Sequence, residues 1–363
     1  LLTSFDEPAK DPRGESATGQ QIAAFSPDGA TLATIAGKRM ILPPYFDPSE
    51  SVHLWDARTG RALGEPLSNP GLVRALAFSK NSKHLIVGAS SAPSKNQSET
   101  SFVQTWNVAE RKRVATSTQI AGRIKTATVA DNGQFFAVSI FEYTRTKEEK
   151  PRLQVTDGHV LVWQLHEDGA FERYGNPLRT HHVVWSMEFS PDSRMLLAGC
   201  ENGNAYLWSI STGQRLRQPI LHEGNSLKVA FSKDGRLALT ASAGAGVNVS
   251  ARLWEVPSYR HMGPPLPQPS GIAGTSWAND GEHVWIACER TASRWHPFLG
   301  VMKEQYSLPK EAHWFFFTKD DYRMIAHCHD GLLREFDVRT DQSKQLMRAN
   351  EQGRGVFVDY HAA

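Results

Sequence analysis

Cysteine, net charge and long apolar runs are all scarce in this 363-residue sequence. Three cysteines do not make the disulfide framework of a small secreted domain. Lys and Arg number 40 against 38 Asp and Glu, and the resulting formal charge of +2 gives no field for non-specific binding of nucleic acid or anionic membrane. The longest apolar runs fall far short of a membrane span. We therefore expect no nucleic-acid partner and no membrane insertion in this segment.

The common catalytic motifs are missing as well. The sequence contains no GxSxG nucleophile elbow, no P-loop and no HExxH zinc motif. We therefore expect no enzymatic activity and no cofactor.

What the sequence does contain is a repeated unit, of which His181–Gly213 is the most compact copy. The hydrophobic runs VVWSMEF, RMLLAGC and NAYLWSI are each followed by turn residues, namely SPDS, ENGN and STGQ. Short runs bounded by such turns predict three consecutive antiparallel strands. A fourth run, Arg215–Leu221, completes the unit.

Seven copies of this unit follow one another at spacings of 40 to 60 residues. Each first strand ends at an anchor before a turn such as SPDG, and the anchors are Phe25, Phe78, Val129, Phe189, Phe231, Trp277 and Phe317. One such unit cannot bury both of its faces, so the repeats predict one domain. The predicted fold class is all-β, a seven-bladed β-propeller of four-stranded antiparallel blades over residues 20–350. Residues 1–19 are then an N-terminal extension or closing strand, and residues 351–363 a C-terminal strand or the start of a further repeat.

The pattern resembles the WD40-repeat family. The residues that carry the resemblance are Leu54-Trp55-Asp56, Leu207-Trp208-Ser209, Leu253-Trp254-Glu255 and Glu335-Phe336-Asp337, each downstream of an FSPDG-like turn. Segments such as ARTGRALGEPLSNPGLVRALAFS also look like repeats in bacterial WD40 arrays, which often follow a Ser/Thr kinase domain. The resemblance implies a protein-interaction scaffold. A sensor domain of a larger kinase is an alternative, although this chain has no kinase motif.

The family's buried polar tetrad, which the resemblance implies, is incomplete. His181 and His222 fit its histidine position, Asp157 and Asp330 its aspartate position, and Asn202 takes the place of the aspartate in the fourth blade. No blade has all the members. We therefore expect packing, more than polar networks, to hold the blades together.

Insertions fall between the second and third strands of several units. They cover Gly37–Ser51, Ser90–Ser101, Phe141–Asp157 and Ser242–Ser250. In a propeller these loops share one face, and insertions on one face commonly mark the binding face. Tyr45 and Phe46, beside two prolines, are candidate partner contacts, unless their loop folds back and buries them. The third insertion is predicted to be a solvated hairpin.

The first strands add further candidates. Apolar residues lie five and two positions before several anchors, and this spacing breaks strict alternation and predicts a bulge. The residues four before the anchors are Gln21, Arg74, Lys125, Trp185, Leu227, Ala273 and His313. Core packing does not explain four of these residues, namely Arg74, Lys125, Trp185 and His313. We expect them to bind a protein or peptide partner, and Arg74 and Lys125 favour an acidic one. Ordinary solvated surface is the alternative.

The Cys/His cluster at His327–Asp330 suggests zinc at first sight. Aligned on the repeat, however, Cys200, Cys288 and Cys328 occupy the same strand position in three blades. A small buried cysteine fits such a position, and we expect no metal site. Free thiols favour a cytoplasmic location.

Two function classes therefore remain. The first is a non-catalytic scaffold that docks a peptide or domain on the inserted face. The second is a propeller enzyme or small-ligand binder that uses the central channel. The second class needs convergent carboxylates or histidines, and the candidates found are basic and aromatic.

Overall fold

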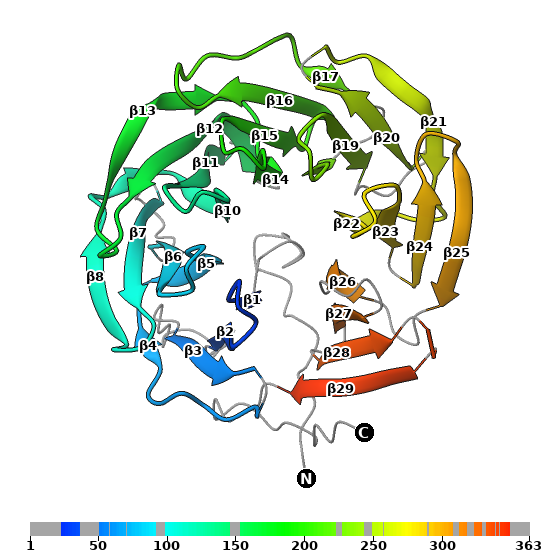
Figure 1. The fold of residues 1–363 in the computed structure, drawn as a ribbon. Helices are drawn as coiled ribbons and strands as arrows, with labels where there is room; N and C mark the ends of the chain where they lie inside the picture. The colour runs from blue at the N-terminus through cyan, green and yellow to red at the C-terminus, as the bar shows by residue number, and fades with distance from the viewer. Residues whose placement is uncertain are drawn as a thin grey trace. The chain divides into compact units, whose positions relative to one another are not determined.

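The computed structural model describes residues 23–348 with gaps at 37–50, 58, 70, 92–98, 146–152, 223–226, 243–248, 257, 289, 308–311, 318–322, 329–331, 338 and 341. The described chain forms seven sheets of consecutive antiparallel strands, shown in chain order in Figure 1. This succession confirms the predicted fold class, an all-β seven-bladed propeller. No helix of membrane-spanning length and hydropathy occurs among the described residues.

The chain divides into two compact units, of which the first holds three sheets. The first sheet contains β1 (Ala23–Phe25), β2 (Thr31–Ala36), β3 (Ser51–Asp56) and β4 (Leu67–Ser68). The second contains β5 (Leu72–Phe78), β6 (His84–Ser90), β7 (Thr100–Asn107), β8 (Lys112–Thr116) and a short fifth strand, β9 (Ile120–Ala121), that pairs with β7. The third contains β10 (Arg123–Val129), β11 (Phe135–Arg145), β12 (Leu153–Leu165) and β13 (Phe171–Arg179).

The second unit, Val184–Arg348, holds four sheets. The fourth sheet contains β14 (Val184–Phe189), β15 (Met195–Cys200), β16 (Asn204–Ser209) and β17 (Ile220–Leu221). The fifth contains β18 (Leu227–Phe231), β19 (Leu237–Ser242), β20 (Ser250–Glu255) and β21 (His261–Pro267). The sixth contains β22 (Ile272–Trp277), β23 (Val284–Cys288), β24 (Thr291–His296) and β25 (Val301–Ser307), and the seventh β26 (Ala312–Phe317), β27 (Arg323–Cys328), β28 (Leu332–Asp337) and β29 (Gln342–Arg348).

Two strand predictions need correction. The run Arg215–Leu221 forms only the two-residue strand β17 and one isolated bridge between Trp208 and Arg215, because Pro219 cannot donate to the strand ladder. The insertion Phe141–Asp157 is mostly strand, since β11 and β12 stay paired as far as Arg145 and Leu153. It is a hairpin, as predicted, but an extension of the sheet more than a loop.

The apolar core lies between successive sheets. In the first unit, Ile86 of the second sheet packs with Ile124, Phe136 and Trp163 of the third. The rings of Phe136 and Trp163 are stacked, with centroids 5.2 Å apart. In the second unit the same arrangement joins the fourth sheet to the fifth, the fifth to the sixth and the sixth to the seventh. Successive sheets of each unit therefore bury apolar side chains against one another. Burial of apolar surface is the main favourable term in folding.

The close packing of the fourth and fifth sheets explains why residue 199 is glycine. A Cβ added to Gly199 in β15 would lie 2.7 Å from the Leu227 carbonyl oxygen and 2.8 Å from Val229 Cγ1, both in the fifth sheet. These distances are well inside van der Waals contact. Only glycine therefore lets the fourth and fifth sheets pack at their present separation.

The first-to-second-strand turns are built by one repeated set of hydrogen bonds. The Ser26 hydroxyl donates to Asp28 Oδ1 at 2.5 Å, and Asp28 Oδ1 accepts from the Ala30 amide. Equivalent pairs are Ser190–Asp192 and Ser232–Asp234. The serine hydroxyl and the backbone amide hold the pKa of Asp28 below its ordinary value. The SPDG pattern therefore acts as a local turn device.

Part of the incomplete tetrad survives as bonds between tryptophan and threonine. Trp55 Nε1 donates to Thr34 Oγ1 at 2.9 Å, and Trp254 Nε1 donates to Thr240 Oγ1 at 2.8 Å. The predicted histidine and aspartate positions also meet once, since His181 Nδ1 lies 3.3 Å from Asp157 Oδ1. Asp330 lies outside the described residues.

The bond between Trp254 and Thr240 yields a stability prediction. Thr240 is completely buried, and Thr240→Val keeps its shape but leaves the indole N–H without its acceptor. We expect the free energy of unfolding to fall by about 1–3 kcal/mol in a denaturant titration. Trp254→Phe removes the donor, so the double variant should lose less than the two single losses added together. Strictly additive losses would show that this hydrogen bond does not couple the two side chains.

Candidate functional site

Bulges occur in five of the first strands, and three of them are the bulges that the spacing of apolar residues predicted near Arg74, Lys125 and Trp185. Pairing with the second strand shifts between Val73 and Ala75, Ile124 and Ala127, Val184 and Ser186, Ile272 and Gly274, and Ala312 and Trp314. The residues that fall in these shifts include Arg74, Lys125, Trp185 and His313. An extra residue in one strand turns its side chain away from the regular alternation. The spacing argument from the sequence is therefore confirmed at these positions.

The fifth sheet is the exception. β18 pairs with β19 without a shift, and Leu227 lies opposite Ser242. Leu227 is completely buried and contributes to the core between the fourth and fifth sheets. β18 therefore has no bulge at Leu227, and here the residue is used for packing. Gln21 lies outside the described residues.

All five bulges lie at the same end of their sheets. In each sheet the first strand begins, the second ends and the third begins at this end, which we call the inserted end because the insertions lie there. The opposite end carries the turns of the Ser26–Asp28 type. In the first unit, the inserted end of the second and third sheets gathers a set of charged side chains.

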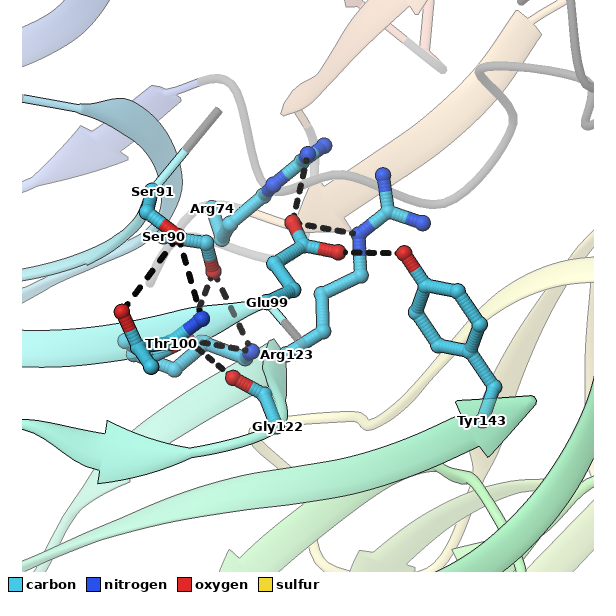
Figure 2. Close-up of polar contacts among 10 residues, drawn as sticks. Arg74, Ser90, Ser91, Glu99, Thr100, Gly122, Arg123 and Tyr143 are labelled. Carbon is cyan, nitrogen blue, oxygen red and sulfur yellow. Dashed lines mark hydrogen bonds and ion pairs between the residues drawn. The ribbon is translucent and has the colours of Figure 1, made fainter. Parts of the chain in front are cut away.

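Glu99 is the centre of this set, which we call the Glu99 cluster: Arg74, Glu99, Arg123 and Tyr143 (Figure 2). Tyr143 Oη donates to Glu99 Oε2 at 2.7 Å. Arg74 Nη2 lies 3.4 Å and Arg123 Nε 3.5 Å from Glu99 Oε1. Tyr143 comes from the strand extension that forms the third insertion, and Glu99 directly precedes β7. The cluster therefore joins two insertions and two first strands.

The Glu99 cluster is buried. The side chain of Glu99 is 1% exposed, and those of Arg74 and Arg123 are each 6% exposed. Arg74 is thus an ion-paired side chain inside the inserted end, whereas the prediction treated it as a surface contact. Two guanidinium groups share the carboxylate of Glu99. Lys125, half-buried on the same strand as Arg123, adds a further positive charge.

A row of hydroxyl groups fixes the strands beside the cluster. The Ser90 and Ser101 hydroxyls lie 2.7 Å apart, and the Ser101 hydroxyl donates to the Gly122 carbonyl at 2.8 Å. The Ile124 amide donates to Ser101 Oγ at 3.2 Å. Gly122 has φ of +94°, and a Cβ there would lie 2.8 Å from the Phe141 carbonyl oxygen. Buried polar groups that are satisfied in this way hold one arrangement of neighbouring strands.

The other predicted contacts belong to different parts of the chain. Trp185 lies in the second unit, partly exposed in the β14 bulge. His313 lies at the corresponding position of β26, as placed by its backbone. Tyr45 and Phe46 lie outside the described residues. A role of these residues in partner binding stays a prediction.

Sequence reasoning missed several residues at this end. Glu99 and Tyr143 were counted as parts of a flexible loop and a solvated hairpin, and Arg123 fell outside the spacing rule. An available signal was the lone carboxylate at the start of β7, since the neighbouring first strands carry Arg74 and Arg123. A buried carboxylate needs such partners.

Sequence reasoning also missed Lys228, a cation in β18, which is a first strand without a bulge. It follows Leu227 in β18, where it pairs with Ala241, and retains some accessible surface. Burial nevertheless lowers the pKa of its ammonium group. The positively charged form is therefore held in an unfavourable environment within the second unit.

The cysteine prediction is confirmed for strand position. Cys200, Cys288 and Cys328 each end a second strand and lie opposite the first residue of the first strand. Cys200 and Cys288 are buried free thiols. Among the residues that the structure describes, no group of three His, Cys, Asp or Glu side chains has a metal-binding arrangement. His329 and Asp330 lie outside them.

The pKa of Lys228 gives a prediction about stability and pH. Because the folded-state pKa is lowered, folding is penalised at neutral pH, and the penalty disappears as pH rises toward the unfolded value of about 10.4. We expect Lys228→Met to raise the free energy of unfolding at pH 7, with the gain shrinking at high pH.

Lys112→Met, on the exposed outer strand β8, is the matched control for this measurement. Denaturant titrations over a pH series compare the two variants with the wild type. A loss of stability in Lys228→Met at pH 7 would contradict the assignment of an unfavourably placed charge.

Comparisons with known proteins agree with this architecture. The family model described as "WD domain, G-beta repeat" matches residues 175–209, which span the end of β13 and the first three strands of the fourth sheet. The periodic tryptophan protein 2 homolog of Schizosaccharomyces pombe is 29% identical over 121 residues, covering 32% of this chain and 14% of that protein. Apoptotic protease-activating factor 1 of Danio rerio is 25% identical over 220 residues, covering 61% of this chain and 15% of that protein.

The chain thus spans only a small fraction of each of these curated relatives. What it shares with the matched family model is the repeat itself, with a four-stranded sheet and an aromatic residue in the third strand. The match at residues 175–209 identifies one WD repeat, and the seven sheets in succession extend the same kind of architecture through the described residues, so the chain is similar to the WD40-repeat family.

Proposed function

We propose that this chain is a non-catalytic scaffold that docks an acidic peptide or domain on the inserted end of its sheets. The observation that carries the proposal is the recurrence of a bulge at one position in five sheets. At this position the side chain is released from the alternation that core packing requires. In chain order, the first two of these bulges hold the cations Arg74 and Lys125, and the third holds the aromatic ring of Trp185.

Charge at the inserted end of the first unit supports an acidic partner. Arg74, Lys125 and Arg123 bring three basic side chains to this end, and Lys125 is half-buried. Basic side chains at a docking surface favour an acidic partner through charge complementarity. In this proposal Lys125 contacts the partner, while Arg74 and Arg123 contribute positive potential from behind it.

Trp185 supplies apolar contact area in the same proposal. It is partly exposed in a sheet whose other tryptophan, Trp208, is 2% exposed and packed into the sheet. Aromatic residues with accessible surface are enriched among the residues that dominate binding energy. Tyr45 and Phe46 take the same role in the first insertion. The cytoplasmic location expected from the free thiols suits such a scaffold.

A peptide-display selection against the intact chain tests this function. We expect the selected peptides to be enriched in Asp and Glu and to lose affinity as salt is added, because charge complementarity drives the encounter. For the tightest peptide, Lys125→Glu should weaken binding by about tenfold, measured by titration calorimetry.

Lys112→Glu provides the control, because it makes the same charge change on an outer strand away from the inserted end. It should change the affinity by less than about twofold. Peptides without acidic enrichment, or equal losses from Lys112→Glu and Lys125→Glu, would exclude the inserted end of the first unit as the docking surface.

A further inference from the structure

One hairpin turn of the sixth sheet concentrates exposed apolar side chains. Seven large hydrophobic residues are exposed in the part of the chain that the structure describes, and four of them lie between β24 and the start of β25. They are Phe298, Leu299, Val301 and Met302, with exposed fractions of 38%, 63%, 46% and 44%. We call this set the β24–β25 patch. Grouping of this kind marks interaction surfaces, whereas single exposed apolar residues are ordinary.

The sequence of this turn departs from its counterparts in the other sheets. The turns between third and fourth strands elsewhere are mostly polar, with at most two large apolar or aromatic residues each, and read DARTGR, NVAERK, LHEDGA, SISTGQ, EVPSYR and DVRTDQ. In the sixth sheet the equivalent segment reads HPFLGVM. A local turn needs none of these bulky side chains, because polar residues make the same connection in the other sheets.

The patch is held rigidly against the fifth sheet. A Cβ on Gly300 would meet the ring of Pro264, and a Cβ on Gly263 would lie 2.7 Å from the Pro297 carbonyl oxygen. Both glycines have positive φ, which suits this close packing of backbone on backbone. The rings of His296 and Phe298 lie 6.1 Å apart. The apolar side chains are thus presented on a fixed support, which lowers the entropy lost on binding.

Two charged residues of β25 lie next to the patch and favour a partner with the opposite charges at the matching positions. Lys303 and Glu304 follow the patch directly, and both are exposed. Glu304 is fixed in place, since it accepts a hydrogen bond from Tyr306 Oη at 2.8 Å and lies 3.6 Å from Arg294 Nη1. In a two-fold contact, each partner presents the same patch to the other. Lys303 of one copy can then face Glu304 of the other, and the reverse pair forms by symmetry.

From these observations we infer that the β24–β25 patch is a self-association surface, with a second copy of this chain as its occupant. Side chains make the contact, because the register shift at Lys303 interrupts the outer edge of β25 and disfavours strand addition. The formal charge of +2 adds little repulsion between copies. Four side chains supply less than the roughly 800 Å² per partner of a standard interface, so the dimer is weak.

Sedimentation equilibrium of the chain over a concentration series tests this inference. The wild type should show a reversible monomer–dimer equilibrium. Leu299→Ser with Met302→Ser should raise the dimer dissociation constant about tenfold or more. The control, Val114→Ser with Leu216→Ser, removes two exposed apolar residues elsewhere and should leave the dissociation constant unchanged.

Charge reversal tests the pairing independently. Lys303→Glu and Glu304→Lys each place like charges opposite one another and should weaken the dimer severalfold. The double exchange restores opposite charges and should recover most of the affinity. A monomeric wild type would overturn the inference, and so would an extended-peptide ligand that binds the patch without self-association. Failure of the double exchange to restore affinity would overturn the two-fold pairing.

Discussion

Burial of both apolar faces of a sheet is the constraint on which this structure depends. A four-stranded sheet of this composition has a hydrophobic face on either side, and one sheet cannot cover its own two faces. Each sheet therefore takes part in an apolar cluster with the next sheet of its unit. The chain repeats a nearly constant set of packing residues, while the residues at the strand ends vary from sheet to sheet.

We assign the partner contacts to the strand ends, where the residues vary from sheet to sheet. The turns of the Ser26–Asp28 type are closed by their own hydrogen bonds, and they connect strands without using side chains from other sheets. The inserted end differs, because bulges there turn a side chain out of the regular alternation in five of the first strands, and because the Glu99 cluster joins two sheets of the first unit. Two insertions contribute Glu99 and Tyr143 to a buried cluster, so the insertions are partly structural. A rigid sheet with a variable, charged end is a suitable platform for protein interaction.

The sequence was informative where one pattern repeats and uninformative where contacts are unique. Seven anchors and their turns predicted the number of sheets, and the three-residue spacing of apolar positions predicted the bulge at Trp185. Repetition cannot predict the Glu99 cluster, because Glu99 and Tyr143 come from insertions whose sequences differ from those of the other insertions. The repeat alignment places Leu227 at the same position as Trp185, and it cannot tell a bulged position from a packed one. The apolar turn at Phe298–Met302 was visible in the sequence, but its exposure depends on how the fifth and sixth sheets meet.

We propose that the packed sheets hold the inserted end in a fixed arrangement that a partner can bind. Hydrogen–deuterium exchange of the intact chain, alone and saturated with a selected acidic peptide, tests this proposal most directly. We expect slower amide exchange in the bound state at the start of β5 and β10 and near Glu99, with no change at the turns around Asp28 and Asp192. Protection centred on those turns or on the outer strands, with none at the inserted end, would contradict it.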